Sequence, residues 1–140
     1  MNKLYLLKVY PNGNGREVYR KIEITGDATL DDLCRTIRAS FDFIDEHLYE
    51  FCMDNRMYSD YSYQSAPECG ELSTKIRLDR IRLQEKQKFL LHYDFGDDWL
   101  FTINVEKINK TEMAILPRVI KQKGEIEQYP DVDDWDWEDE

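Results

Sequence analysis

The sequence lacks most of the signals that identify an enzyme or a membrane protein directly. Its 140 residues include only six glycines and two histidines, and they contain no phosphate-binding glycine loop and no nucleophile motif. No apolar run is long enough to cross a bilayer, and the N-terminus has no secretory cleavage signal. We therefore expect a single cytoplasmic domain at residues 1–129, followed by an acidic, tryptophan-containing tail at 130–140.

Cysteine is scarce, and its positions form no regular spacing. The three cysteines, Cys34, Cys52 and Cys69, are odd in number and far apart, which favours free thiols in a reducing compartment over a disulfide framework. No cysteine or histidine has a second one at the short separation that a zinc site uses. The sequence therefore predicts neither a bound metal nor a cofactor.

The acidic charge is uneven along the chain. The formal net charge is −10, but seven of the 29 acids lie in residues 131–140 without a base, so the rest of the chain is close to neutral. General nucleic-acid binding is therefore disfavoured. A basic patch at Lys75, Arg77, Arg80 and Arg82 is typical of a solvated strand edge, although it would also suit a phosphate backbone or the acidic tail.

The first half of the chain predicts a hairpin followed by a helix. Apolar residues alternate in 4–10 and 16–24 around a turn-forming stretch, with Arg20 the one polar residue on the apolar face of the second strand. The Thr29 hydroxyl is placed to cap a helix that begins at Leu30, whose apolar stripe continues to Phe41 and includes Cys34. A strand at 47–53 and an irregular surface excursion at 58–72 follow.

The strongest motif lies in a second hairpin, over residues 88–105. Pairing across a three-residue Gly96-Asp97-Asp98 loop sets Phe95 opposite Trp99 and gives one continuous apolar face. In this structural interpretation Gly96 takes a positive φ, Asp97 and Asp98 accept N–H groups of the turn, and Trp99 anchors the hairpin in the core.

The string Tyr-Asp-Phe-Gly-Asp-Asp-Trp at 93–99, with Thr-Leu-Asp-Asp-Leu at 29–33 and His-Leu-Tyr-Glu-Phe at 47–51, resembles the plasmid pRiA4b ORF-3-like family. The resemblance implies a small α+β protein, in some members encoded on plasmids or mobile elements, without an established activity. Members often carry cysteines after a Pro-Arg pair. Here none follows Pro117-Arg118, so a metal role for that segment does not carry over.

These elements predict an α+β domain with a largely antiparallel or mixed sheet, covered on one face by one main helix, in the manner of the β-grasp plan. The leading functional hypothesis is a non-catalytic binding module. Its protein partner and its oligomeric state are unknown. The alternatives are a small metal-dependent enzyme, in which His92 would join the acids of the turn, and a nucleic-acid accessory protein that uses the basic patch. The candidate binding residues are His47, Asp94, Asp97, Asp98, Trp135 and Trp137.

Overall fold

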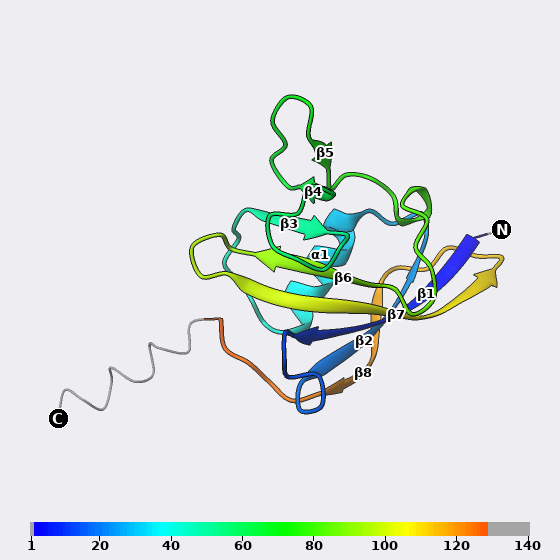
Figure 1. The fold of residues 1–140 in the computed structure, drawn as a ribbon. Helices are drawn as coiled ribbons and strands as arrows, with labels where there is room; N and C mark the ends of the chain where they lie inside the picture. The colour runs from blue at the N-terminus through cyan, green and yellow to red at the C-terminus, as the bar shows by residue number, and fades with distance from the viewer. Residues whose placement is uncertain (1, 129–140) are drawn as a thin grey trace.

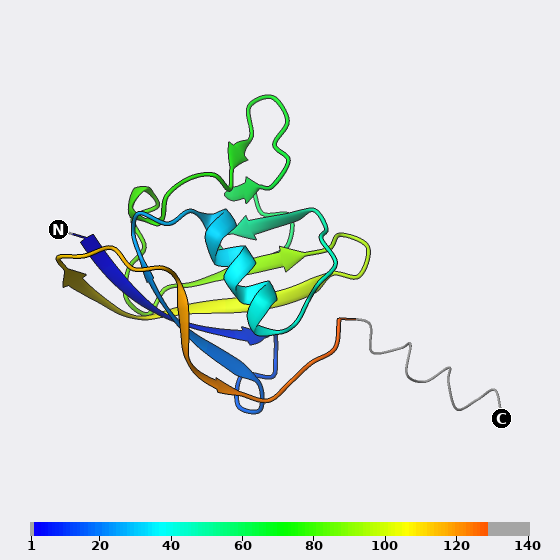
Figure 2. The same cartoon turned by 180° about the vertical axis from the view of Figure 1, so that it is seen from behind.

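A twisted eight-stranded sheet with one helix on its face forms the protein (Figures 1 and 2). The computed structural model describes residues 2–128. The strand order is β5-β4-β3-β6-β7-β1-β2-β8, and every pairing is antiparallel except the parallel pair β4 and β5. The elements are β1 (Asn2–Pro11), β2 (Tyr19–Thr25), α1 (Leu30–Ser40), β3 (Tyr49–Cys52), β4 (Ser62–Gln64), β5 (Leu72–Ser73), η1 (Leu78–Arg80), β6 (Lys88–Tyr93), β7 (Trp99–Thr111) and β8 (Arg118–Lys123). The predicted α+β class with a mixed sheet is confirmed.

The helix begins where the sequence predicted. The Thr29 hydroxyl accepts a hydrogen bond from the Asp32 N–H, and the Asp32 carboxylate accepts one from the Thr29 N–H, which together form a capping box. The apolar stripe of α1 faces the sheet, and Figure 2 shows the helix lying across it. Cys34 is buried on that stripe, and its burial raises the pKa of the thiol to about 12. Cys34 is therefore a core residue.

The first hairpin buries the face that its alternation predicted, including its single charged member. Arg20 is fully buried, and its guanidinium lies 4.2 Å from the centroid of the Phe41 ring. Its Nε donates to the Ser40 carbonyl, and its Nη1 donates to the carbonyls of Lys123 and Gly124 at 3.1 and 2.8 Å. Arg20 thereby fastens the end of β8 to the core.

The predicted register of the second hairpin is wrong by two residues. Tyr93 pairs with Trp99 and Leu91 with Phe101, so the connection is a five-residue loop, 94–98. Because the shift is even, the same side chains still share a face. Trp99 is half-buried and stacks beside Phe101, as its predicted anchoring role requires. Phe95 does not pair with Trp99, because it lies in the loop.

Three further segments differ from the sequence predictions. The excursion at 58–72 contains the short strands β4 and β5, and the loop between them projects from the sheet with Cys69 exposed (Figure 1). The basic patch lies on η1 and the turns around it, so it is not the edge of a strand. The strand β8 was not predicted. Within residues 2–128, no helix is both long and apolar enough to cross a membrane.

Candidate functional site

The most polar buried cluster centres on His92 of β6. Its Nδ1 lies 2.8 Å from Glu50 Oε2, and its Nε2 lies 2.6 Å from Asp98 Oδ1. The imidazole is 0% exposed, whereas the side chain of Asp98 is 48% exposed. Each nitrogen of the imidazole therefore faces a carboxylate oxygen at hydrogen-bond distance. The series of contacts from Glu50 through His92 to Asp98 therefore connects the interior of the protein to the exposed 94–98 loop.

The sequence analysis did not identify Glu50 as a member of this cluster. Glu50 lies directly opposite His92 in the β3–β6 pairing. It also accepts hydrogen bonds from the Tyr58 N–H and the Gln64 amide, each at 2.9 Å. Burial alone would raise the pKa of Glu50, but the hydrogen bonds from His92, Tyr58 and Gln64 outweigh burial and lower it. The alternation of β3 and β6 puts both residues on the second face of the sheet, and that pattern was the available signal.

Two aromatic rings cover the imidazole of His92. The Tyr58 ring meets it edge-on with centroids 5.1 Å apart, and the Phe95 ring lies 4.9 Å away. Because both ring nitrogens are engaged by carboxylates, the imidazole has no free nitrogen for a substrate or a metal ion. The role that this geometry supports is to hold Asp98 and the loop in place.

The loop itself is organised by Asp94, which corrects the sequence prediction. Asp94 Oδ1 accepts hydrogen bonds from the N–H groups of Gly96 and Asp97, and the Asp98 N–H donates to the Asp94 carbonyl. The positive φ angles belong to Asp94 and Asp98 rather than to Gly96. Aspartate tolerates this conformation better than most residues. The loop is therefore held by its own hydrogen bonds.

The structure brings His47 and Asp94 together. His47 Nε2 lies 3.4 Å from Asp94 Oδ2. The His47 N–H donates to the Tyr93 hydroxyl, which donates in turn to the Asp45 carbonyl. These contacts seat the connector 41–48 against the end of β6. A cavity of about 300 Å³ borders His47 and is also lined by Arg35, Arg38, Tyr49 and Ser65.

The remaining predicted binding residues are not part of this pairing. Asp97 is exposed at the tip of the loop. Trp135 and Trp137 lie outside the described residues, and so does the predicted docking of the tail. Within residues 2–128, no group of three or more histidine, cysteine, aspartate or glutamate side chains is arranged to hold a metal ion.

Three segments form what we call the acidic end: the connector 41–48, the loop 94–98 and the segment 124–128. The Tyr93 hydroxyl and the His47–Asp94 pair join the first two, and the Gln128 amide donates to the Asp45 carbonyl at 3.2 Å to join the third. The segments contain no lysine or arginine. Their seven exposed acids are Asp42, Asp45, Glu46, Asp97, Asp98, Glu125 and Glu127.

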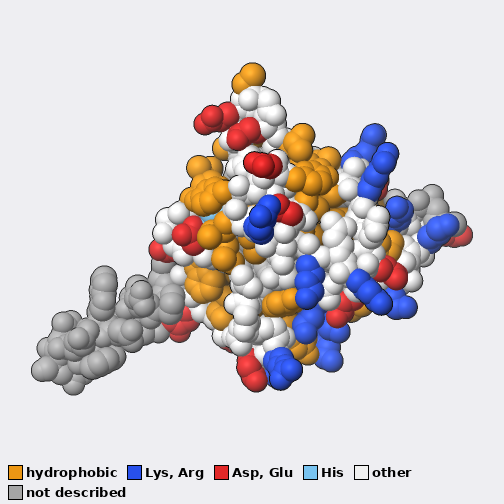
Figure 3. All heavy atoms as spheres, in the orientation of Figure 1, with side chains coloured by type: hydrophobic (Ala, Val, Ile, Leu, Met, Phe, Trp, Pro, Cys, Tyr) orange, Lys and Arg blue, Asp and Glu red, His pale blue; other side chains and the backbone are white. Residues whose placement is uncertain are grey.

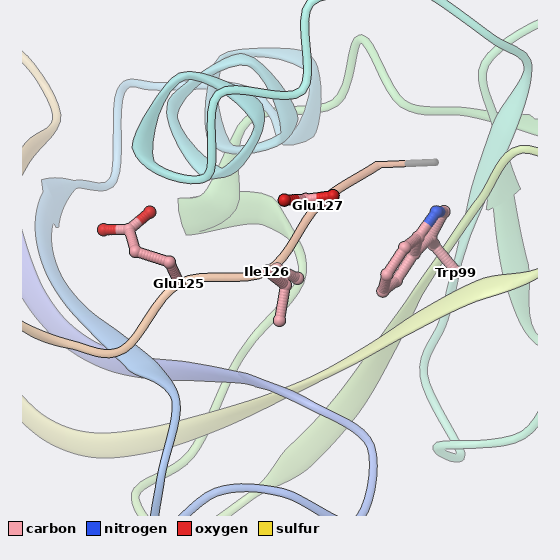
Figure 4. Close-up of a pocket in the computed structure, with 4 residues that line it drawn as sticks. All are labelled: Trp99, Glu125, Ile126 and Glu127. Carbon is pink, nitrogen blue, oxygen red and sulfur yellow. The ribbon is translucent and has the colours of Figure 1, made fainter. Parts of the chain in front are cut away.

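The acidic end also contains a cavity of about 340 Å³ beside Trp99 (Figure 4). Ile126 faces Trp99 across it, and Glu127 lies above Ile126 on the same side of the cavity. The indole Nε1 donates to the Gln128 carbonyl at 3.1 Å. Gly124 at the base of this segment has a φ of +74°, and a Cβ there would approach the Glu17 carbonyl oxygen to 2.4 Å. The segment therefore follows a path that requires glycine.

The basic patch lies toward the opposite side of the molecule. In Figure 3 most of the visible lysine and arginine side chains gather on the right, away from the β6–β7 loop. Arg77 pairs with Asp79 at 2.5 Å. Lys75, Arg80 and Arg82 are exposed and form no ion pair within residues 2–128. We call this stretch, residues 74–88, the basic end.

Residues 3–133 match the model of the family described as plasmid pRiA4b ORF-3-like protein. The chain belongs to this family. It is also similar to a crystal structure of the protein of unknown function MM3350 from Methanosarcina mazei Go1, with 30% identity and a TM-score of 0.71. That match covers 87% of this chain and 70% of the other. No curated protein matches the chain.

For this member of the pRiA4b ORF-3-like family, the string at 93–99 that carried the resemblance now has a physical explanation. Tyr93 fixes the connector, Asp94 organises the loop, Asp98 binds His92, and Trp99 walls the cavity. Each of these contacts positions the acidic end. The motif therefore positions the acidic end, through hydrogen bonds within the loop and through contacts with His92, Asp45 and Gln128 outside it.

Proposed function

We propose that this protein is a non-catalytic binding module whose acidic end recognises a basic protein partner. The observation that carries the proposal is the gathering of seven exposed acids from three separate segments, with no lysine or arginine among them. Arg38 pairs with Glu46 at 3.6 Å and Arg20 pairs with Glu125 at 3.4 Å, so the seven acids are partly neutralised. The excess of negative charge that remains attracts a cationic partner and speeds its association. The proposed partner is therefore a protein with a lysine- or arginine-rich surface.

Exposed apolar side chains support a protein as the partner. Ile44 is 82% exposed and Leu48 is 56% exposed, and both belong to the connector of the acidic end. Apolar side chains that lie among charges are typical of the centres of protein interfaces, where they exclude water from the charged contacts around them. Ile44 and Leu48 therefore supply contact area that a small cation alone would not use.

The rigidity of the loop is a second support. His92 holds Asp98 from below, and Asp94 uses one oxygen to bind two N–H groups of the turn. A surface that is already ordered loses little conformational entropy when a partner binds. The same contacts occupy the groups that a hydrolytic or metal-dependent mechanism would need to be available, so they favour binding over catalysis.

The finer parts of the sequence interpretation belong to this proposal. A cytoplasmic location accords with three free cysteines. A plasmid or mobile-element origin has its support in the family description. The order of hairpin, helix and further strands supports the likeness to the β-grasp plan.

Calorimetric titration of the full chain with a lysine-rich peptide tests the proposal. A triple variant, Asp45→Asn/Glu46→Gln/Asp97→Asn, should weaken binding about tenfold, since each exposed charge contributes up to about 1 kcal/mol. The matched control Asp60→Asn/Glu68→Gln/Glu112→Gln removes the same charge from other exposed positions, so any effect of net charge or of the tail is shared. Equal loss in both variants, or no binding by the unmodified chain, would overturn the proposal.

A further inference from the structure

The cavity beside Trp99 lies within the acidic end, and its walls have a defined chemistry (Figure 4). Trp99 comes from the start of β7, and Glu125, Ile126 and Glu127 come from the segment after β8. Its volume of about 340 Å³ is at the small end of the range for ligand pockets. This space suits one long side chain better than a large ligand.

The indole of Trp99 is held in one orientation. Its Nε1 is fixed by the Gln128 carbonyl, the Phe43 ring meets it edge-on with centroids 4.9 Å apart, and the Phe101 ring stacks beside it at 6.0 Å. A fixed indole presents a flat, electron-rich wall. Tryptophan provides the strongest aromatic surface for a cation.

The opposite wall of the cavity, residues 125–127, is also fixed in position by a buried residue. Arg20 binds the carbonyls of Lys123 and Gly124, and its Nη2 lies 3.4 Å from Glu125 Oε1. Arg20 therefore offsets the charge of Glu125, while Ile126 gives the wall an apolar surface and Glu127 brings a carboxylate to it. Asp45 and Gln128 meet at the same segment, with the Asp45 N–H donating to Gln128 Oε1 at 3.4 Å.

An apolar wall, an aromatic wall and a neighbouring carboxylate together fit a group with an apolar stem and a cationic head. Lysine and arginine side chains have this form, because their methylene stems pack on apolar surface while the charged head stays near solvent or an acid. We propose that the Trp99 cavity takes one lysine or arginine side chain of the basic partner. This inference rests on the proposed function and names the contact that fixes the position of the partner.

The fluorescence of Trp99 tests this inference directly. The chain has three tryptophans, so Trp135→Phe/Trp137→Phe leaves Trp99 as the single indole. Titration with the lysine-rich peptide should change the Trp99 emission with the same Kd that calorimetry gives. The same peptide with acetylated lysines, which lack the positive charge, should leave the emission unchanged.

A matched pair of variants supplies the second readout. Glu127→Gln should weaken peptide binding about threefold, as expected for one exposed charge, whereas Glu112→Gln, beyond the far end of β7, should not change it. Peptide binding with unchanged Trp99 emission and equal affinities of the two variants would overturn the cavity assignment alone. No heat of binding with any form of the chain would overturn the proposed function and this inference together.

Discussion

The two charged ends of the molecule differ in what lies beneath their surface. At the acidic end, buried residues hold the exposed acids: His92 binds Asp98, and Arg20 binds the segment that carries Glu125. At the basic end, Arg80 at the end of η1 and Arg82 in the turn after it are exposed without a described ion pair, and Arg82 has a positive φ of 66°. The basic end also enters the core, through Leu78, Ile81 and Leu83. The difference is that its exposed bases Arg80 and Arg82 have no described ion pair, whereas exposed acids of the acidic end have buried partners.

This difference shows that net charge is a poor guide to how charge is used. Along the sequence, the acids are densest in the tail and the bases are densest between residues 75 and 88. The fold also gathers a further group of acids from three segments that are far apart in the chain. An acid with a buried partner keeps its position when a ligand arrives. Exposed bases without such a partner produce an electrostatic field, but their charges have no fixed positions.

The strongest way to break the comparison is to remove the support beneath the acidic end. His92→Leu leaves the Glu50 carboxylate buried without its imidazole partner, and we expect a loss of about 3 to 5 kcal/mol in the free energy of unfolding. Urea denaturation measures this loss. The control is His47→Leu, because that imidazole is partly exposed and should cost less than about 1 kcal/mol. Equal losses for the two variants would show that the contacts of His92 with Glu50 and Asp98 add no more to the free energy of unfolding than those of an exposed histidine.

A second change loosens one wall of the cavity. Arg20→Met removes the donors for the carbonyls of Ser40, Lys123 and Gly124, and it should cost about 2 to 3 kcal/mol. Limited proteolysis should then cleave the chain near residues 123–128 faster than in the unmodified protein. Arg16→Met, at an exposed position of the first turn, is the control. Unchanged protection of that segment would mean that Arg20 does not hold it.

The smallest effect is expected at the basic end. Arg80→Gln/Arg82→Gln should change the free energy of unfolding by less than about 0.5 kcal/mol, because neither side chain has a described partner to lose. Thermal unfolding measures this change, and the affinity for the lysine-rich peptide should stay within about twofold of the unmodified value. A loss of more than about 1 kcal/mol would show that the basic end is structural after all.

Local signals explain which parts of the fold were predictable. The capping box at Thr29 and Asp32 and the alternation of β1 involve neighbouring residues, so the sequence revealed them. Besides its own hydrogen bonds at Asp94, the loop 94–98 depends on contacts of Asp98 with His92 and of Asp94 with His47, which a local pattern does not reveal. For the same reason its register was wrong by two. Strand β8 was not predicted, because its mostly exposed residues show no clear alternation. It forms a strand by pairing with β2, about 100 residues earlier in the chain.

The candidate site was predictable in part. His47 lies against Asp94, and Asp94 organises the loop that carries Asp97 and Asp98. Their role in binding stays a prediction. Glu50 and Arg20 were missed as functional supports, because charged residues are rarely fully buried and an apolar pattern treats them as interruptions. Their partners come from strands and segments far away in the chain.

The projecting loop between β4 and β5 has a practical consequence. Cys69 on this loop is exposed, whereas Cys34 and Cys52 are buried, and burial raises the pKa of each buried thiol to about 12. The molecule therefore carries one natural attachment point for a maleimide dye or a sensor surface. A protein immobilised there would present both its charged ends to solution, without any engineered cysteine.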